Sequence, residues 1–508
     1  MVLLLIQPYL FDDKQITKAS SISIGLFRIK SFLKEYGIET TIFDPNLSEN
    51  PLTELNNLIS RFNIKYVGFS TTLISIEYDL SLFYYLKKKF KNIIFIFGGH
   101  EVTIRGLDFI DYFSNQDWLK NVYFVMGEGE NVILEIIKKS QLKKFDELNE
   151  ISGLFSSNTK YCKMPTPLSQ NEFNRFSMLL NYRDMYEKYD SDWIRIFSSR
   201  SCKYNCAFCS NSSDNYQIYK KQNVYLSNQN LIKTILNIIS EFPYIEGIRF
   251  NDDDFLYRGH DEWLSLSKEI IYLKSIGKIP IDLKFAGQTR VDRLENEILK
   301  SLVSMGFKSI ALGVESFSIK QLKEFNKNLS PSICIKVLNK LIVSGFNIHI
   351  NIILFSPESS IMDLEVNLKY CLYFFKNGAN VSITPYVYSL YNTLMYKKYK
   401  GSIYKKTVII PNTNMSLFKE CFIFPSDESI RKISTEIVKK AIEDTNSFIG
   451  NACRWQSNKP YIFALHILLN LADSLYCLNR LDNNEYYSYK HDINIILKRY
   501  SLNDSCIN

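Results

Sequence analysis

Apolar and polar positions along the first 140 residues alternate between two periods. Short apolar runs typical of buried strands occur at residues 2–6, 40–43, 66–70, 93–97 and 122–125. Between the first two runs, residues 24–36 carry apolar side chains at helical spacing, and Gly37 stands where a helix commonly ends. Because strands that alternate with helices build a parallel sheet, residues 1–142 are predicted to form an open, Rossmann-like α/β domain.

The same alternation returns after residues 143–190, a polar segment of weak periodicity that we interpret as a connector between domains. Strand-like runs then occur at residues 194–197, 247–250, 281–285, 308–312, 347–352 and 381–384. Six strand–helix units are fewer than the eight of a closed barrel. Residues 191–400 are therefore predicted to form a partial (β/α)6 barrel of the TIM type.

Beyond about residue 404 the strand pattern fades. Helical spacing dominates at residues 429–442, 462–477 and 486–500. Residues 401–508 are thus predicted to form a helical domain that caps the barrel. Its aromatic residues, Tyr461 and Phe463 among them, either close over the barrel mouth or belong to the core.

Charge and hydropathy narrow the class of protein. The chain carries 61 basic and 53 acidic residues, a net charge of +8, and its lysines are spread over the whole length. Nucleic-acid binding is not favoured, because it usually needs basic residues gathered into a patch. The N-terminal apolar run ends at Gln7, and polar residues interrupt the later stretch 461–475. The pattern predicts neither a signal peptide nor a membrane span, so we expect a cytoplasmic protein.

Three cysteines are crowded, whereas the other seven of the ten are separated by long gaps. Cys202, Cys206 and Cys209 directly follow the first strand of the predicted barrel, on the face where such folds carry their active sites. Iron–sulfur clusters usually take four thiolates, so three would leave one iron open to another ligand. A zinc site would need a fourth ligand, and the nearest histidine is the distant His260. A chance group of core cysteines is the other alternative.

The spacing C-x3-C-x2-C on a strand–helix loop resembles the signature of the radical S-adenosylmethionine (SAM) superfamily. Phe208 before the third cysteine fits that pattern as a cofactor-site residue, whereas Ser201 replaces a common glycine. The resemblance implies a [4Fe-4S] cluster on the three cysteines, with SAM chelated at the open iron and cleaved reductively to a 5'-deoxyadenosyl radical. It also implies an electron donor such as flavodoxin or ferredoxin.

Further cofactor-binding candidates follow the second and third strands of the predicted barrel. Asp252 and Asp253 resemble the acidic form of a family motif that meets the SAM amino group; an acidic turn or helix cap is the structural alternative. Arg290 resembles the family's arginine after the third strand, although an isolated arginine more often forms a surface ion pair.

The end of the fourth strand supplies a closer match. Gly313, Glu315 and Ser316 resemble the Gly-x-Glu-Ser element that lines the SAM site in this superfamily. The resemblance implies that Glu315 holds the ribose hydroxyls or the amino group of SAM. A purely structural carboxylate is the alternative.

The N-terminal domain resembles the cobalamin-binding domain that is fused to many radical SAM enzymes. The matches are Gly25 at the start of the first helix, Gly98 and Gly99 after the fourth strand, and Gly127 and Glu128 after the fifth. Glycines at these strand ends let a ligand approach the backbone. The motif D-x-H-x-x-G, whose histidine ligates cobalt in cobalamin mutases, does not occur, and His100 is not assigned as a ligand.

These resemblances predict a radical SAM enzyme with a [4Fe-4S] cluster, SAM and cobalamin, acting as a methyltransferase in natural product biosynthesis. The predicted reaction is cobalamin-dependent methylation of an unactivated carbon in a small molecule or a peptide. A second hypothesis keeps the radical but drops methyl transfer: rearrangement, cyclisation or oxidation of a peptide or metabolite. A third is a non-catalytic carrier of cobalamin or metal, against which the ordered cysteines argue.

Overall fold

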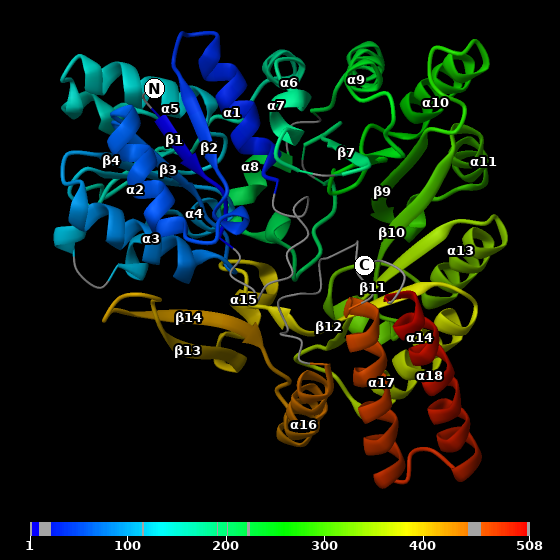
Figure 1. The fold of residues 1–508 in the computed structure, drawn as a ribbon. Coiled ribbons are helices and arrows are strands. Elements are labelled where there is room, and N and C mark those ends of the chain that lie inside the picture. The colour runs from blue at the N-terminus through cyan, green and yellow to red at the C-terminus, as the bar shows by residue number, and fades with distance from the viewer. Residues whose placement is uncertain are drawn as a thin grey trace.

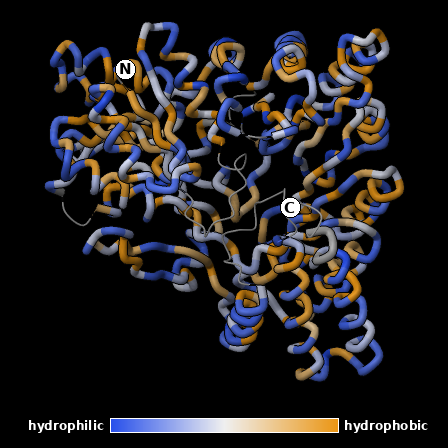
Figure 2. The backbone as a smooth tube through the Cα atoms, in the orientation of Figure 1, coloured by the Kyte–Doolittle hydropathy of each residue, from blue (hydrophilic) through white to orange (hydrophobic). Residues whose placement is uncertain are grey.

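The computed structural model describes residues 3–9, 22–113, 116–189, 191–200, 202–220, 224–445 and 459–504. Two parallel sheets dominate it, one in the N-terminal third and one in the middle of the chain, and three long helices follow (Figure 1). Figure 2 shows hydrophobic residues concentrated along the strands and on the helix faces that cover them. The predicted α/β architecture of an open sheet, a partial barrel and C-terminal helices is confirmed.

The N-terminal sheet has six strands in the order β2-β1-β3-β4-β5-β6. The first five are parallel: β1 (Leu3–Ile6), β2 (Thr40–Phe43), β3 (Tyr66–Ser70), β4 (Ile94–Gly98) and β5 (Val122–Val125). Its helices are α1 (Ile24–Lys34), α2 (Pro51–Phe62), α3 (Ile76–Lys89), α4 (His100–Arg105) and α5 (Glu130–Gln141). Alternate residues of β1 point to opposite faces, so Leu3 and Leu5 pack with α1 and α5 while Leu4 and Ile6 pack with α2 and α3.

The connector contributes to the first sheet. Its short strand β6 (Leu154–Phe155) pairs antiparallel with β5, and its helices are α6 (Gln170–Met178) and α7 (Tyr182–Tyr186). Ser169 and Glu172 form a capping box that begins α6. The polar residues that weakened the periodicity of this segment thus include the groups that fix a helix end.

The second sheet has eight strands in the order β13-β14-β12-β11-β10-β9-β8-β7. The six predicted parallel strands are β7 (Trp193–Ile196), β8 (Gly247–Phe250), β9 (Lys284–Arg290), β10 (Phe307–Glu315), β11 (Asn347–Phe355) and β12 (Asn380–Tyr388). The helices between them are α8 (Gln217–Lys220), α9 (Asn228–Glu241), α10 (His260–Ser275), α11 (Asn296–Met305), α12 (Ile319–Glu324), α13 (Pro331–Val343) and α14 (Ile361–Lys376).

Two expectations about strands were wrong. The third barrel strand begins at Lys284 rather than at residue 281, because Pro280 and Leu283 close a turn there. Strands also continue beyond residue 404: after α15 (Leu394–Lys398), a hairpin of β13 (Ile403–Ile409) and β14 (Ser416–Ile423) joins the sheet antiparallel to β12. The strand β13 is exposed along most of its length, so it lacks the apolar alternation that would have marked it.

The C-terminal helices are α16 (Glu428–Thr445), α17 (Lys459–Cys477) and α18 (Asn483–Asp504). Among the described helices, α17 alone is long and apolar enough to cross a membrane, and 61% of its apolar window is buried inside the protein. The start of α17 reaches the barrel, where the Tyr461 hydroxyl lies 2.6 Å from His349 Nδ1. His349 is the third residue of the nine in β11, so Tyr461 covers the floor of the barrel and not its mouth.

Candidate active site at the facing sheet edges

The cysteine loop begins where β7 ends, and Asp252 fixes its first residues. The Asp252 carboxylate accepts hydrogen bonds from the backbone N–H groups of Ser198, at 3.0 Å, and Ser199, and from both serine hydroxyls. Burial raises the pKa of Asp252 to about 6, against the effect of these hydrogen bonds. Asp252, predicted as a cofactor contact, therefore ties the end of β8 to the start of the loop.

The three cysteines of the loop are free thiols. Burial raises the pKa of Cys202 to about 12 and that of Cys209 to about 11, and each of these thiols also feels the charge of another cysteine of the loop. Cys206 Sγ accepts a hydrogen bond of 3.6 Å from Arg290 Nη1. The loop thus carries three partly buried thiols, one of which faces a guanidinium.

Arg290 is held from several sides. Its guanidinium donates to both carboxylate oxygens of Asp292, at 2.9 and 3.0 Å, and to the Lys327 carbonyl at 2.8 Å. It also stacks on Tyr204, with its central carbon 3.7 Å from the ring centroid. The predicted cofactor arginine therefore faces a cysteine and its loop, and its bonds leave it little freedom to turn toward another ligand.

Glu315 has the most unusual backbone in this region. It is a non-glycine residue with φ of +68°, and the pairing of β10 with β11 shifts register between Gly313 and Glu315. Lys327, itself only 3% exposed, holds its carboxylate at 2.8 Å. A Cβ at Gly313 would lie 2.6 Å from Glu315 Oε1, so the glycine leaves space for this ion pair. Such local strain is commonly kept at ligand sites.

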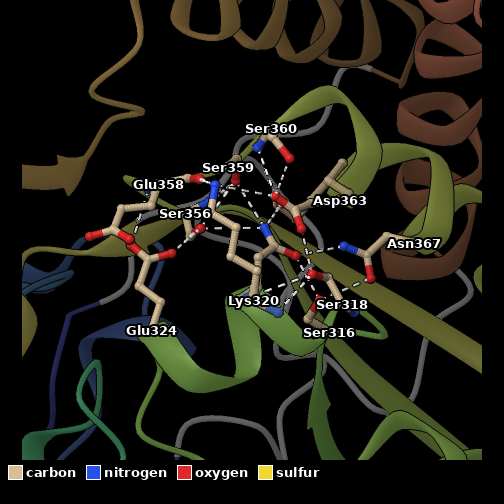
Figure 3. Close-up of polar contacts among 12 residues, drawn as sticks. Ser316, Ser318, Lys320, Glu324, Ser356, Glu358, Ser359, Ser360, Asp363 and Asn367 are labelled. Atoms are coloured by element: carbon tan, nitrogen blue, oxygen red, sulfur yellow. Dashed lines mark hydrogen bonds and ion pairs between the residues drawn. The ribbon is translucent and has the colours of Figure 1, made fainter.

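Ser316, which follows Glu315 in the chain, belongs to a buried polar network (Figure 3). Its hydroxyl donates to Gln321 Oε1 at 2.6 Å and accepts from the Ser318 N–H at 2.9 Å. The side chains of Gln321 and Asn367 extend the network to β11 and α14. Ser316, predicted as a cofactor contact, uses its hydroxyl hydrogen bonds to stabilise the turn after β10.

Phe208 packs edge to face on Phe325, with ring centroids 5.4 Å apart, and lies 5.9 Å from Lys327 Nζ. The Ala207 N–H donates to the Phe325 carbonyl at 2.8 Å. The third cysteine is thus fixed by an aromatic contact to the segment that also carries Lys327.

The carboxyl edges of the two sheets face each other. His100, at the start of α4, lies against Tyr216 of the cysteine-loop segment, with ring centroids 5.4 Å apart. Burial lowers the pKa of His100 and raises that of Tyr216, and the charge of nearby Asp253 raises both values. The side chain of Asp253 is itself exposed, although the protein atoms around it raise its pKa through desolvation. Asp253 therefore lies at the interface of the two domains.

Glu128 joins three segments at this interface. Its carboxylate pairs with Arg200 Nε at 2.9 Å and accepts the N–H of Leu168 in the connector at 2.8 Å. Arg200 stands two residues before Cys202. Glu128, predicted as a cofactor contact, thus locks the cysteine loop onto the N-terminal domain.

A cavity opens at the carboxyl edge of the first sheet. Its lining includes Gly25, Gly68, Gly98, Gly99, Gly127 and Gly129, and Arg200 closes it from the barrel side. A Cβ at Gly25 would meet nothing within 4 Å, and one at Gly98 nothing closer than 3.7 Å. At Gly99 (φ +94°) a Cβ would lie 2.7 Å from the Thr71 nitrogen, so that position requires glycine. The predicted glycines thus lie together around one cradle.

These features fit the cofactors that the resemblance implies. Three thiols at a strand end form the donor set of a cluster with one open iron. The glycines of the cradle leave backbone accessible for a ligand to approach. Among the described residues, no group of three or more His, Cys, Asp and Glu side chains converges on a single ion position.

Sequence reasoning missed Lys327, Arg200 and Tyr216. Each acts through a partner that is distant in sequence: Glu315, Glu128 and His100, respectively. A lysine whose side chain is only 3% exposed is rare unless it is paired, but burial is not visible in a single sequence. Only the position of Arg200, just before the first cysteine, offered a signal.

Residues 196–365 match the family model of the radical SAM superfamily, so the barrel is a radical SAM domain, as the cysteine spacing predicted. The chain is also 24% identical over 391 residues to an uncharacterized methyltransferase of Pyrococcus horikoshii, covering 76% of this chain and 81% of that one.

Two solved structures share the fold over most of the chain. The radical SAM methyltransferase TsrM from Kitasatospora setae, with cobalamin and a [4Fe-4S] cluster bound, has a TM-score of 0.63 at 12% identity, covering 84% of this chain and 88% of that one. The cobalamin-dependent SAM radical enzyme OxsB has a TM-score of 0.65 at 15% identity, covering 99% and 80%. The combination of open sheet, barrel and C-terminal helices is thus a shared fold.

Proposed function

We propose that this radical SAM enzyme transfers a methyl group to an unactivated carbon of a natural product or a peptide, using a [4Fe-4S] cluster, SAM and cobalamin. One observation carries the proposal. Arg200 connects the glycine-lined cavity of the first sheet with the cysteine loop of the barrel. It lines the cavity, and it stands two residues before Cys202. The names of the solved neighbours and of the curated relative support the choice of cofactors and of methyl transfer.

In this proposal Cys202, Cys206 and Cys209 hold the cluster, and the Glu315–Lys327 pair with Asp253 faces the SAM side. The cradle at Gly98, Gly99 and Gly127 holds cobalamin. When bound, these groups supply radical formation and the methyl donor, which is chemistry that protein side chains cannot perform.

The chain's own residues position and shield these groups. Asp252 and Arg290 fix the cysteine loop at both ends through the contacts to Ser198, Ser199 and Cys206. The Glu128–Arg200 pair, of which the glutamate is 5% exposed, holds the two sheet edges together and limits the entry of water. We further propose a cytoplasmic enzyme that receives electrons from a flavodoxin or ferredoxin.

The proposal is tested with full-length protein reconstituted anaerobically with iron and sulfide. It is incubated with SAM, cobalamin and a reductant, and two products are measured by mass spectrometry. S-adenosylhomocysteine reports methyl transfer from SAM, and 5'-deoxyadenosine reports radical cleavage. Both products are expected, the first only when cobalamin is present. If 5'-deoxyadenosine forms and S-adenosylhomocysteine does not, methyl transfer is rejected while the radical chemistry stands.

A second candidate, a radical rearrangement or oxidation without methyl transfer, is favoured by the likeness to OxsB. That structure covers 99% of this chain and is named a radical enzyme rather than a methyltransferase. The mass of the product distinguishes the two, because methylation adds CH2 whereas oxidation removes hydrogen.

A further inference from the structure

Two arginines lie side by side on the inner face of the barrel. Arg195 of β7 and Arg249 of β8 are direct partners in the parallel register. Their chain neighbours Ile194, Ile196 and Ile248 are completely buried in the core outside the sheet, whereas both arginines are half-buried. Because successive side chains of a strand alternate between faces, the two guanidinium groups belong to the inner side.

His349 and Tyr461 lie close enough to Arg249 to interact with its charge. Burial, together with the charge of Arg249, lowers the pKa of His349 to about 3, so the imidazole is neutral. His349 lies on β11, and two strands separate β11 from β8 in the sheet. Arg249 therefore acts on it across the inside of the barrel. Tyr461, which is hydrogen-bonded to His349, also interacts electrostatically with Arg249 and raises its pKa, against the effect of burial.

Arg195 and Arg249 carry charges of the same sign. Burial lowers the pKa of Arg195, and burial together with Arg195 lowers that of Arg249 to about 10. The Arg195 guanidinium forms no hydrogen bond or ion pair with any residue that the structure describes. By contrast, the buried Arg105 elsewhere in the protein pairs with Glu101 and Glu420. Like charges directly opposite each other on neighbouring strands destabilise a sheet.

The inner wall above the two arginines carries polar side chains. Asn351 and Ser382 form a hydrogen bond of 2.7 Å, and both are half-buried on the strands that face β7 and β8. At the rise of a strand, Arg249 lies roughly 10 Å below Asp252, where the mouth begins. A substrate that contacts both the arginines and the loop is therefore elongated.

We infer that Arg195 and Arg249 bind an anionic group of the substrate, a carboxylate or a phosphate monoester, at the floor of the barrel. A planar guanidinium binds either anion with two parallel hydrogen bonds, and the ligand supplies the negative charge for which Arg195 has no described partner. The opposite end of the substrate then points toward the cysteine loop. This inference deepens the proposed function by naming the substrate class.

The test measures anion binding without turnover, on the full-length reconstituted protein. Inorganic phosphate and succinate serve as probes in isothermal titration calorimetry at constant ionic strength. The variant Arg195→Gln is expected to weaken binding of the preferred anion at least about tenfold, because a charge-assisted bidentate contact is lost. Preference for succinate indicates a substrate carboxylate, and preference for phosphate indicates a phosphate ester.

The matched control is Arg175→Gln, which removes a surface arginine that is 58% exposed and paired with Glu35. Its anion affinity is expected to equal that of the wild type. In buffer without the probe anions, Arg195→Gln should melt at the same or a higher temperature than the wild type, since a like charge is removed. Equal binding of both anions by wild type and Arg195→Gln, or no binding at all, overturns the inference. Either result leaves methyl transfer untouched, because neither measurement involves SAM.

Discussion

At its carboxyl edge the N-terminal sheet presents glycines, whereas the barrel presents charged side chains that are held by hydrogen bonds. At the first edge, Gly98, Gly99 and Gly127 line a cavity and leave it without side chains at these positions. The second fixes Asp252 and Arg290 through several contacts each. Both edges belong to parallel sheets with helices on their faces, so the fold alone does not set this difference.

The difference reflects what each edge has to hold. A large planar or elongated ligand is bound by leaving space along the backbone, which glycine provides. A small inorganic group bound by thiols needs those thiols at fixed positions, which requires supporting contacts from the next layer of residues. Ligand binding at the barrel edge should therefore be lost when a single supporting contact is removed. Ligand binding at the edge of the N-terminal sheet should be lost when a side chain is added.

The largest effect is expected for Cys206→Ala at the barrel edge. Removing one of the three proposed cluster ligands should abolish SAM cleavage and lower the iron and acid-labile sulfide bound per chain. The control is Cys334→Ala, which removes a fully buried thiol of the core and should cost stability without loss of iron. Full retention of iron by Cys206→Ala would contradict the assignment of the cluster.

Next in size is Gly99→Ala at the sheet edge. A Cβ there would lie 2.7 and 2.9 Å from the Thr71 backbone, in addition to the cost of a positive φ. We expect a loss of about 2–4 kcal/mol in the free energy of unfolding and weaker cobalamin binding. Gly37→Ala is the matched control: it also has positive φ, but nothing lies within 4 Å, so about 1 kcal/mol is expected. Equal losses in urea denaturation would show that steric contact is not the cause.

A moderate effect is expected for Gly313→Ala, which adds a side chain to the barrel edge. The new Cβ would displace the Glu315–Lys327 pair, from whose atoms it would lie 2.6 and 2.9 Å away. SAM affinity, measured by equilibrium dialysis, should fall about tenfold, the size of one lost charge-assisted contact. Gly25→Ala, where a Cβ meets nothing within 4 Å, should leave SAM affinity unchanged. Unaltered affinity in Gly313→Ala would remove Glu315 from the SAM site.

The last prediction concerns a pH dependence that Asp252 causes. Its folded pKa of about 6 is higher than the ordinary value of 3.8, so folding favours the protonated form. Asp252 should therefore lower the free energy of unfolding as pH rises from about 4 to 6, by at most about 1.4 kcal/mol per pH unit. Asp252→Asn should remove this slope when both proteins are denatured with urea across that range. Parallel pH profiles would show that the Asp252 pKa is not raised.

Patterning predicted the strands whose apolar residues face a core. The bounds of β2, β3, β5 and β8 agree with the predicted runs, because each is buried on one or both faces. The hairpin of β13 and β14 escaped prediction for the opposite reason. Lys419 and Glu420 of β14 are buried as partners of Glu77 and Arg105, so charged residues occupy positions where an apolar alternation would appear.

By itself, the sequence determined the order of strands and helices, the crowded cysteines and the glycines at strand ends, because each depends on residues close together in the chain. Only the tertiary structure decided which partner each polar group meets: Glu128 with Arg200, Glu315 with Lys327, and Arg195 beside Arg249. The physical reason is that burial and electrostatic pairing depend on distances in space, and parallel strands bring together residues that lie tens of positions apart in the chain.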